Sequence, residues 1–325
     1  MRGKGNVRIV LVFVFAALPL VYLAQKPTSK PTQFTKTNSK SIQTPYGTDY
    51  FALEKELIES SLETPEKVPN DICADVPNPF GTTWMKRWQQ LYGARLFDAT
   101  VIDLDTGCTF HAGTPGNGYP TASTGKVMIA TQNLRNVDAG KYSQASISRD
   151  LKLMILNSDN DAGTRLYKKI GRNAGIQKVV DTAHLSHTRP FKGWGTIMTT
   201  SGDQAKLLRQ LYIQKSLLKS RSTTTLRKLM HAVGDSSKWG IGVRRPSGWS
   251  ALQKNGWHYS RPGIDTPPTG GWRINSLAVL LDQNDKPRWI VTGYGNTFPS
   301  QTQGMKSWTA LGAHVAAVFG ASHTK

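Results

Sequence analysis

The order of strand-like and helix-like segments constrains the fold of this chain more than any other feature of its sequence. Residues 96–104 and 108–113 alternate apolar and polar side chains around an Asp-Thr-Gly turn, so they predict a β-hairpin. Between residues 121 and 235 the apolar side chains recur every three and four positions, which is typical of helices. Strand-like patterns then return in three runs separated by turn residues: 249–259, 272–282 and 288–296.

The last segment, 301–319, places its large apolar side chains on one helical face. Five strands interrupted by a helical block predict an α+β fold, in which helices flank a five-stranded antiparallel sheet and an all-helical lobe at about 121–245 lies beside it. A ligand cleft is expected where the sheet and the lobe meet. We expect this domain to span residues 71–325.

Residues 1–24 have the layout of a signal peptide or a membrane anchor, because basic residues precede an apolar run at 9–24. The run is 16 residues long, shorter than the ~20 that a membrane helix usually needs. Cleavage after Ala24 would put Tyr22 where a small residue is preferred. An uncleaved anchor is therefore favoured, with a secreted form as the alternative.

Residues 25–70 begin with a stretch rich in Lys, Thr, Ser and Pro and predict a disordered tether with a short helix at 50–62. The chain carries 41 Lys and Arg against 21 Asp and Glu, a net charge of +20. Such a charge draws a protein to anionic surfaces. Because export excludes nucleic acid, we expect an extracytoplasmic protein. Anionic cell-envelope polymer and phospholipid are its candidate partners, and an ordinary solvated surface, which would account for most of the charge, is the alternative.

Two cysteines, Cys73 and Cys108, are present. Outside the cytoplasm such a pair predicts one disulfide, with two free buried thiols as the alternative. The sequence has no Cys-x-x-Cys motif and no Cys/His cluster, so neither a metal nor another cofactor is expected.

Ser123 and Lys126 are candidates for a nucleophile and its base. A serine hydroxyl is a weak nucleophile until a base takes its proton. The spacing of three residues puts both side chains on one helix face, and the apolar residues 127–130 predict that this helix is buried. Burial lowers the pKa of a lysine, which would leave Lys126 neutral enough to act as the base. An ordinary helix cap at Ser123 is the alternative, because Ser-x-x-Lys occurs twice more in the chain.

Two other short motifs support the catalytic interpretation. Ser158 and Asn160 stand in a polar loop between two amphipathic segments, from which a hydroxyl and an amide can reach a cleft. Lys254, Asn255 and Gly256 lie in the first strand-like run after the helical block. The lysine supplies positive charge for an acidic group, and the glycine lets a substrate backbone approach the strand.

Ser-x-x-Lys, Ser-Asp-Asn and Lys-x-Gly, in this order and on helix, loop and strand, resemble the motifs of the penicillin-recognising serine enzymes. The order of sheet, helical lobe and sheet is similar to that of the class A β-lactamases. The resemblance covers about residues 75–320. It implies that Ser123 is acylated, that Lys126 is its base or a partner in the proton network, and that Ser158 relays a proton to the leaving nitrogen.

The resemblance also implies binding roles. Asn160 would bind the amide side chain of the substrate, and Lys254 its carboxylate. The backbone N–H groups of Ser123 and Trp257 would form the oxyanion hole. Asn255 stands where the family usually has Thr or Ser, so we expect carboxylate binding with an altered preference.

Two departures bear on turnover. Ser158 follows Ser123 by 35 residues, shorter than is typical of class A enzymes, so a more open cleft is expected. Class A β-lactamases also carry a glutamate, ahead of a Thr-Thr helix start, that activates the deacylating water. Here residues 184–198, ahead of Thr199 and Thr200, contain no acid. Loss of a general base typically slows a reaction by ~10²–10⁴.

The sequence therefore predicts a serine hydrolase that acts on a small-molecule β-lactam or a peptidoglycan-like substrate. One variant hydrolyses β-lactams, and the other is a cell-wall DD-peptidase or transpeptidase that β-lactams inhibit. A non-catalytic cell-wall binding module is the remaining alternative.

Overall fold

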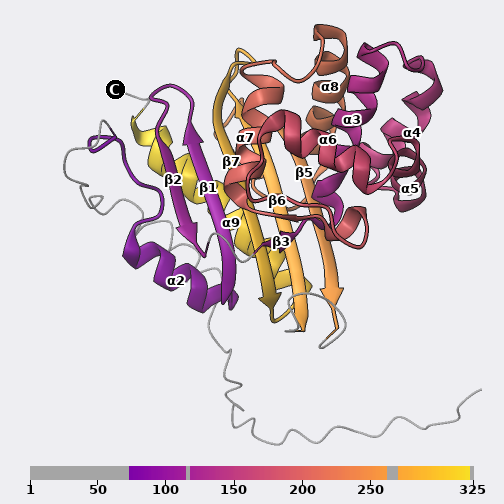
Figure 1. The fold of residues 1–325 in the computed structure, drawn as a ribbon. Coiled ribbons are helices and arrows are strands. Elements are labelled where there is room, and N and C mark those ends of the chain that lie inside the picture. Colours follow the sequence, from indigo (N-terminus) through magenta and orange to yellow (C-terminus); the bar gives the residue numbers. More distant parts are fainter. Residues whose placement is uncertain (1–72, 115–117, 262–269, 323–325) are drawn as a thin grey trace, which may run out of the picture. The chain divides into compact units, whose positions relative to one another are not determined.

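The computed structural model describes residues 73–114, 118–261 and 270–322 (Figure 1). The predicted anchor at 9–24 and the whole of the predicted tether at 25–70, with its short helix at 50–62, lie outside the described residues. Within the described ranges, no helix combines the length and the apolar character that crossing a membrane requires.

Five strands form one antiparallel sheet in the order β2-β1-β7-β6-β5. The first two strands in the chain and the last three therefore meet in the middle of the sheet, where β1 pairs with β7. The strands are β1 (Leu96–Asp103), β2 (Thr109–Gly113), β5 (Ser250–Ser260), β6 (Gly271–Leu281) and β7 (Pro287–Phe298). The predicted five-stranded antiparallel sheet is confirmed.

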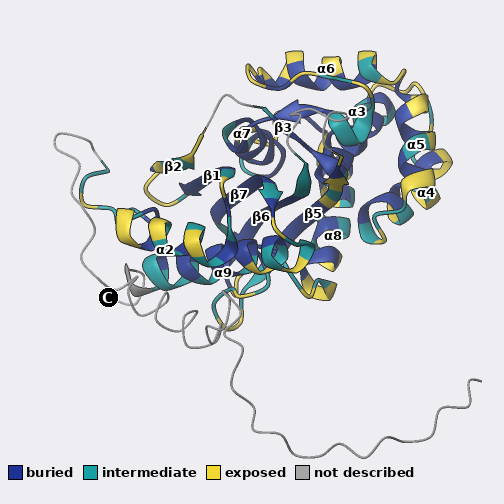
Figure 2. Cartoon of the chain, turned by 90° about the horizontal axis from the view of Figure 1, so that it is seen from below, coloured by how far each residue is buried: buried dark blue, intermediate teal, exposed yellow. Residues whose placement is uncertain are grey.

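Two helices, α2 (Thr82–Tyr92) and α9 (Gln301–Ser322), cover one face of this sheet (Figures 1 and 2). Their contact is aromatic: the indole of Trp88 packs against Trp308 at 5.5 Å between ring centroids. Gly293 on β7 makes room for the Trp308 ring, since a Cβ at this position would lie 2.4 Å from it. Large apolar side chains of α2 and α9 therefore bury this face of the sheet.

The helices between the two groups of strands lie on the other face and beyond it (Figure 1). They are α3 (Lys126–Asp138), α4 (Ala145–Leu156), α5 (Asn160–Lys169), α6 (Asn173–Ala183), α7 (Ser201–Tyr212) and α8 (Ser220–Ser236). Short elements join them: β3 (Tyr119–Pro120) pairs with β4 (Met198–Thr199), and η2 (Ala122–Gly125) and η3 (Trp194–Thr196) are 3₁₀ turns.

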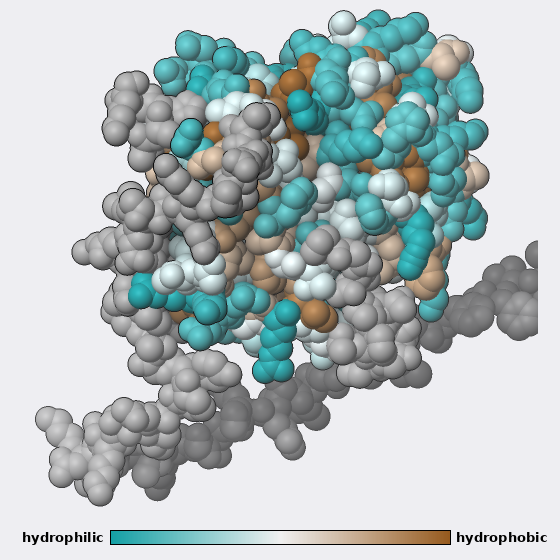
Figure 3. All heavy atoms as spheres, turned by 60° about the vertical axis from the view of Figure 1, so that its left-hand side comes forward, coloured by the Kyte–Doolittle hydropathy of each residue, from teal (hydrophilic) through white to brown (hydrophobic). Residues whose placement is uncertain are grey.

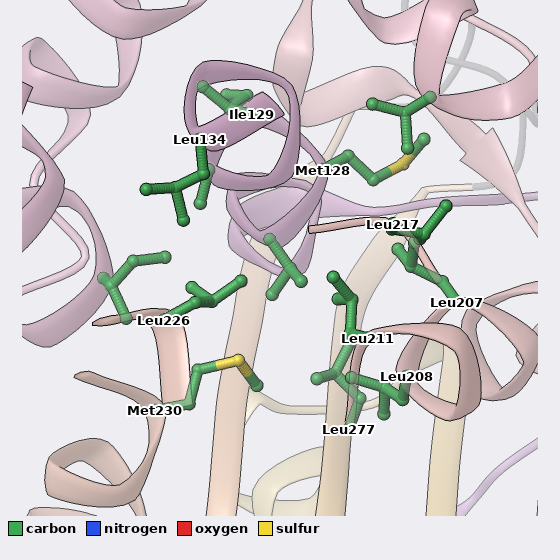
Figure 4. Close-up of a cluster of buried hydrophobic side chains, with 14 of the residues drawn as sticks. Met128, Ile129, Leu134, Leu207, Leu208, Leu211, Leu217, Leu226, Met230 and Leu277 are labelled. Atoms are coloured by element: carbon green, nitrogen blue, oxygen red, sulfur yellow. The ribbon is translucent and has the colours of Figure 1, made fainter. Parts of the chain in front are cut away.

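An apolar core joins these helices to the sheet. Its side chains come from α3, α7, α8 and β6 and point toward one another (Figure 4). They include Met128, Ile129, Leu134, Leu207, Leu208, Leu211, Leu226, Met230 and Leu277, all fully buried. Burial of a leucine-sized side chain contributes about 1.5–3 kcal/mol. This core fixes α3, and with it the position of the turn that precedes α3.

Cys73 and Cys108 form a disulfide that ties the segment before α2 to the hairpin of β1 and β2. Hydrophilic residues cover most of the described surface in the view of Figure 3, with smaller hydrophobic areas between them.

Candidate active site

Ser123 lies on the 3₁₀ turn η2, directly before the buried helix α3. Strand β5 packs against this turn at Gly256, where an added Cβ would lie 2.6 Å from the backbone nitrogen of Ser123. Only a glycine permits this approach. Ala122 adopts a positive φ of 46°, a conformation that an L-residue rarely takes. The turn is therefore held by its surroundings rather than by its own preference.

Ser158 reaches the same place from the loop between α4 and α5. Its φ is 54°, so this residue too is held in the left-handed region, at some cost in energy. The next residue caps α5: the Asp159 carboxylate accepts a hydrogen bond from the Ala162 N–H at 2.7 Å. The cap fixes the loop and aims the Ser158 hydroxyl at the turn that carries Ser123.

Lys254 on β5 completes the group from the sheet. Its side chain is 2% exposed, and its Nζ donates to Ser158 Oγ at 2.9 Å. Three elements that are distant in the sequence thus bring the tips of Ser123, Lys126, Ser158 and Lys254 together.

The Lys126 amine lies at the centre of these contacts. Its Nζ is 3.1 Å from Ser123 Oγ, 3.3 Å from Ser158 Oγ and 2.8 Å from Asn160 Oδ1, and it also donates to the Ser158 carbonyl. The carbonyl oxygens of Ser158 and Asn160 can only accept, so they take the two hydrogens of a neutral amine. The lone pair is then left for the hydroxyl proton of Ser123.

Burial changes the charge of both lysines. Desolvation lowers the pKa of Lys126 to about 8, against a smaller opposing effect of the Asp159 carboxylate. Desolvation, together with the positive charge of Lys126, lowers the pKa of Lys254 to about 7. A neutral amine beside Ser123 is therefore accessible close to neutral pH.

A cleft of about 530 Å³ opens onto this group. It is lined by Ala122, Ser123, Asn157, Ser158, Asn160, Trp194, Gly195, Thr196, Trp257 and His258. Side chains from the helices and from the edge strand β5 meet in it, at the junction of the sheet and the helices. Trp257 is 49% exposed and gives the rim of this cleft an aromatic side chain.

The backbone N–H groups of Ser123 and Trp257, predicted to form the oxyanion hole, belong to residues that both line this cleft. Their assignment to an oxyanion stays a prediction.

Asn255 points into another network. Its Nδ2 donates to the Trp239 carbonyl at 2.8 Å, and its Oδ1 accepts from the Ser276 hydroxyl at 2.8 Å. Neighbouring side chains on a strand point to opposite faces, and Lys254 points toward Ser158. The predicted contact between the Asn255 amide and a substrate carboxylate finds no support in these hydrogen bonds.

The loop ahead of Thr199 brings an indole to the site. The ring centroid of Trp194 lies 4.6 Å from Lys126 Nζ, and its Nε1 donates to Thr164 Oγ1 at 3.3 Å. Trp194 was not among the residues predicted from the sequence. In the sequence, Trp194 stands out only as an aromatic residue between two glycines, in the loop where class A β-lactamases carry a glutamate.

No group of three or more His, Cys, Asp or Glu side chains that could hold a metal ion occurs in the described part of the chain. The side chains described above bring two hydroxyls, two amines and one amide to the site.

A model of the β-lactamase enzyme family matches residues 142–265. Solved structures with a similar fold include a β-lactamase from Xanthomonas campestris pv. campestris, with 19% identity and a TM-score of 0.59, over 72% of this chain and 95% of that one. An ancestral class A β-lactamase matches with 20% identity and a TM-score of 0.59, over 72% of this chain and 98% of that one.

A β-lactamase from Streptosporangium roseum matches with 20% identity and a TM-score of 0.61, over 73% of this chain and 97% of that one. A search among curated proteins gives no match. The resemblance to the class A β-lactamases is confirmed by these similarities, and so is the α+β fold.

Proposed function

We propose that this chain, which shares the fold of the class A β-lactamases, is a serine acyl-transfer enzyme that forms an acyl-Ser123 intermediate with β-lactams or related amides. One observation carries the proposal: the buried Lys126 amine lies 3.1 Å from Ser123 Oγ, while it donates hydrogen bonds to the Ser158 carbonyl and to Asn160 Oδ1. An ordinary helix cap has no need of a desolvated amine beside it. A pure binding module has no need of one either.

In the proposed reaction, the Ser123 hydroxyl attacks the amide carbonyl while Lys126 Nζ takes its proton. The amide C–N bond then breaks, and Ser158 Oγ passes a proton to the leaving nitrogen. Ser158 lies between the two amines, 3.3 Å from Lys126 Nζ and 2.9 Å from Lys254 Nζ. It can therefore be reprotonated at once.

Lys254 is the proposed partner of a substrate carboxylate, and Asn160 of a substrate amide. A carboxylate beside Lys254 would favour the ammonium form of this lysine. Binding of an acidic substrate would thus restore the charge that burial removes.

A DD-peptidase or transpeptidase that β-lactams inhibit is the second candidate, and the loop at 184–198 favours it. Where class A β-lactamases carry a glutamate, this loop contains no acid and presents Trp194 to Lys126. Acylation without fast release of the acyl group is the behaviour expected of an inhibited peptidase.

Incubation with benzylpenicillin, followed by intact-protein mass measurement over time, tests the proposal. We expect an adduct in the wild type and none in Ser123→Ala. Ser216→Ala is the matched control, because Ser216 also begins a Ser-x-x-Lys motif but is exposed and away from the cleft. A persistent adduct supports the peptidase, and rapid loss of the β-lactam without an adduct supports a working lactamase. No adduct and no β-lactam loss would contradict the proposal and leave the binding module, or a hydrolase for other esters or amides.

We further propose that the enzyme works outside the cytoplasm, held to the membrane by residues 9–24 or secreted if that segment is cleaved. The disulfide between Cys73 and Cys108 supports an oxidising compartment. The net charge of +20 suits a surface that meets anionic polymer or phospholipid. Cells that express the full chain are compared with cells that express a chain without residues 1–24. Fractionation, with detection by an antibody against the folded domain, measures the location of each protein.

A further inference from the structure

The indole of Trp194 packs against the Lys126 amine. This amine also contacts four oxygen atoms: Ser123 Oγ, Ser158 Oγ, the Ser158 carbonyl and Asn160 Oδ1. The indole ring lies 4.6 Å from the same nitrogen, measured to its centroid. The ring occupies space beside the amine that a water molecule could otherwise fill.

One hydrogen bond holds the ring, and two contacts of the Trp194 carbonyl hold the backbone of the same residue. Its Nε1 donates to Thr164 Oγ1 on α5 at 3.3 Å. The Trp194 carbonyl accepts from Thr121 Oγ1, beside the turn of Ser123, at 3.2 Å. That carbonyl also lies so close to Gly125 that an added Cβ would be 2.9 Å away. The indole is therefore a fixed part of the site rather than a loose loop side chain.

This position matters for the second half of the proposed reaction. To hydrolyse acyl-Ser123, the oxygen of a water must attack the ester carbon and give a proton to a base, while the C–Oγ bond breaks and Oγ regains a proton. The loop at 184–198 offers no carboxylate for this purpose. The remaining base, Lys126, is shielded from the loop side by the indole.

We propose that Trp194 is a positioning residue that holds the Lys126 amine against Ser123 and keeps water from it, so that the acyl-enzyme is long lived. The inference rests on the proposed acylation of Ser123. It assigns the long lifetime of acyl-Ser123 to the Trp194 side chain as well as to the absence of an acid from the loop at 184–198. An acceptor must then enter from the Ser158 side of the cleft, along the path by which the leaving group departs.

The test uses p-nitrophenyl acetate, which needs no binding site for a carboxylate. The burst of p-nitrophenolate measures acetylation of Ser123, and the decay of the acetyl adduct by intact mass measures deacylation. We expect Trp194→Ala to shorten the lifetime of the adduct by roughly tenfold or more, because water gains access to the base. Trp194→Phe keeps a ring over the amine and is expected to stay within about twofold of the wild type.

Phe191→Ala is the matched control, because it removes an aromatic ring from the same loop without touching Lys126. Its adduct should last as long as that of the wild type. Thermal unfolding of each variant shows whether the loop still folds. If Trp194→Ala does not fold, Trp194→Leu, which removes the ring but fills part of its volume, takes its place with the same expected result.

The pH dependence of the burst rate separates a positioning role from a merely structural one. Removal of the indole lets water solvate the Lys126 ammonium, which raises the pKa of this lysine. The midpoint, the pH at which the burst rate reaches half its maximum, should therefore move to higher pH in Trp194→Ala and stay unchanged in Phe191→Ala. An adduct lifetime in Trp194→Ala equal to that of the wild type overturns the inference. A changed lifetime with an unchanged midpoint overturns the part of it that has Trp194 act through Lys126.

The two proposals fail in different ways. If p-nitrophenyl acetate labels Ser123 with a lifetime that depends on Trp194, but benzylpenicillin does not label it, then the proposed substrate class is wrong and the role of Trp194 stands. If neither reagent labels Ser123, both proposals are wrong.

Discussion

Lys126 and Lys254 place two amines within hydrogen-bonding distance of one hydroxyl, that of Ser158. Two ammonium groups this close repel each other, and burial disfavours the charge on both. The site is therefore built to keep at least one amine neutral near pH 7. The contact of Lys126 with Ser123 identifies which neutral amine can take a proton from the nucleophile.

This arrangement predicts the pH dependence of acylation. The pKa of Lys126 is lowered to about 8, and its base form exists above that value. The burst rate with p-nitrophenyl acetate, an ester without a carboxylate, should therefore rise as the pH passes upward through about 8. With benzylpenicillin the rate should also show a falling limb at higher pH, because Lys254 must keep its proton to bind the carboxylate. A burst rate that is flat from pH 6 to 9 would contradict the role of Lys126.

Substitution of the base gives a second test at this scale. Lys126→Arg keeps a cation that does not release its proton in this pH range. We expect the acylation rate to fall by about 10²–10⁴, the usual effect of losing a general base. Lys152→Arg, on the neighbouring helix and exposed to solvent, controls for the exchange itself. A Lys126→Arg enzyme with wild-type rates would exclude a lysine base.

Short motifs predicted most of these side chains because chemistry limits them to particular residue types. Ser123, Lys126, Ser158, Asn160 and Lys254 could be proposed from type, spacing and order together with the resemblance to the penicillin-recognising serine enzymes. Trp194 could not, because an indole over an amine follows from how a loop folds back on α3 and α5. For Asn255 the motif predicted a contact with the substrate. It did not predict the hydrogen bonds that this side chain makes to the Trp239 carbonyl and the Ser276 hydroxyl.

At the scale of elements, the site depends on how closely strand β5 approaches the turn η2. Gly256 is the point of contact: an added Cβ would lie 2.6 Å from the nitrogen of Ser123 and 2.8 Å from that of Thr124. Because both neighbours are backbone atoms, Gly256→Ala must push the turn and the strand apart. We expect acylation by benzylpenicillin to slow by about 10² or more, since a displacement of about 1 Å can cost that much.

Gly81→Ala is the control for Gly256→Ala, because a Cβ at Gly81 meets nothing within 4 Å. Both variants should unfold in one transition, and only the first should lose its burst. A Gly256→Ala protein that is acylated at the wild-type rate would show that the approach of β5 to η2 is not needed.

The contact of α9 with the segment ahead of α2 contains a histidine that cannot be charged without loss of stability. His314 is 2% exposed, its Nε2 donates to the Pro79 carbonyl at 2.7 Å, and its ring stacks on Trp84 at 3.9 Å. Burial lowers the pKa of His314 from about 6.5 to about 4.

The unfolded chain therefore binds a proton at His314 between pH 6.5 and 4 that the folded chain does not bind. The free energy of unfolding should fall as the pH drops through this window, by about 3 kcal/mol at its lower end. His314→Gln keeps a donor for Pro79 but does not titrate, so its stability should change less with pH. Urea unfolding of both proteins at pH 7 and pH 4.5 measures the difference, and parallel losses would contradict the role of His314.

For the molecule as a whole, periodicity predicted the regular elements and their order well. The strand predicted at 272–282 is β6 at Gly271–Leu281, and the helix predicted at 301–319 is α9 at Gln301–Ser322. Helix α2 was missed, although Trp84, Trp88 and Tyr92 recur at intervals of four. The strand order could not be read from the sequence, because the pairing of β1 with β7 depends on contacts between the two ends of the domain.

The last prediction concerns the disulfide, which ties the segment before α2 to the hairpin of β1 and β2. It closes a loop with a sequence separation of 35 residues, and such a closure stabilises a folded chain by about 4 kcal/mol, mainly by restricting the unfolded state. Cys108 lies beside β2, at one edge of the sheet, whereas Lys254 lies on β5, at the opposite edge. Reduction, or the pair Cys73→Ala and Cys108→Ala, should therefore lower the free energy of unfolding by about 3–4 kcal/mol and leave the burst rate at 25 °C unchanged. Urea unfolding with and without dithiothreitol, alongside the burst assay, measures both quantities. A loss of the burst in a variant that is still folded would show that the hairpin and the site are coupled through the sheet.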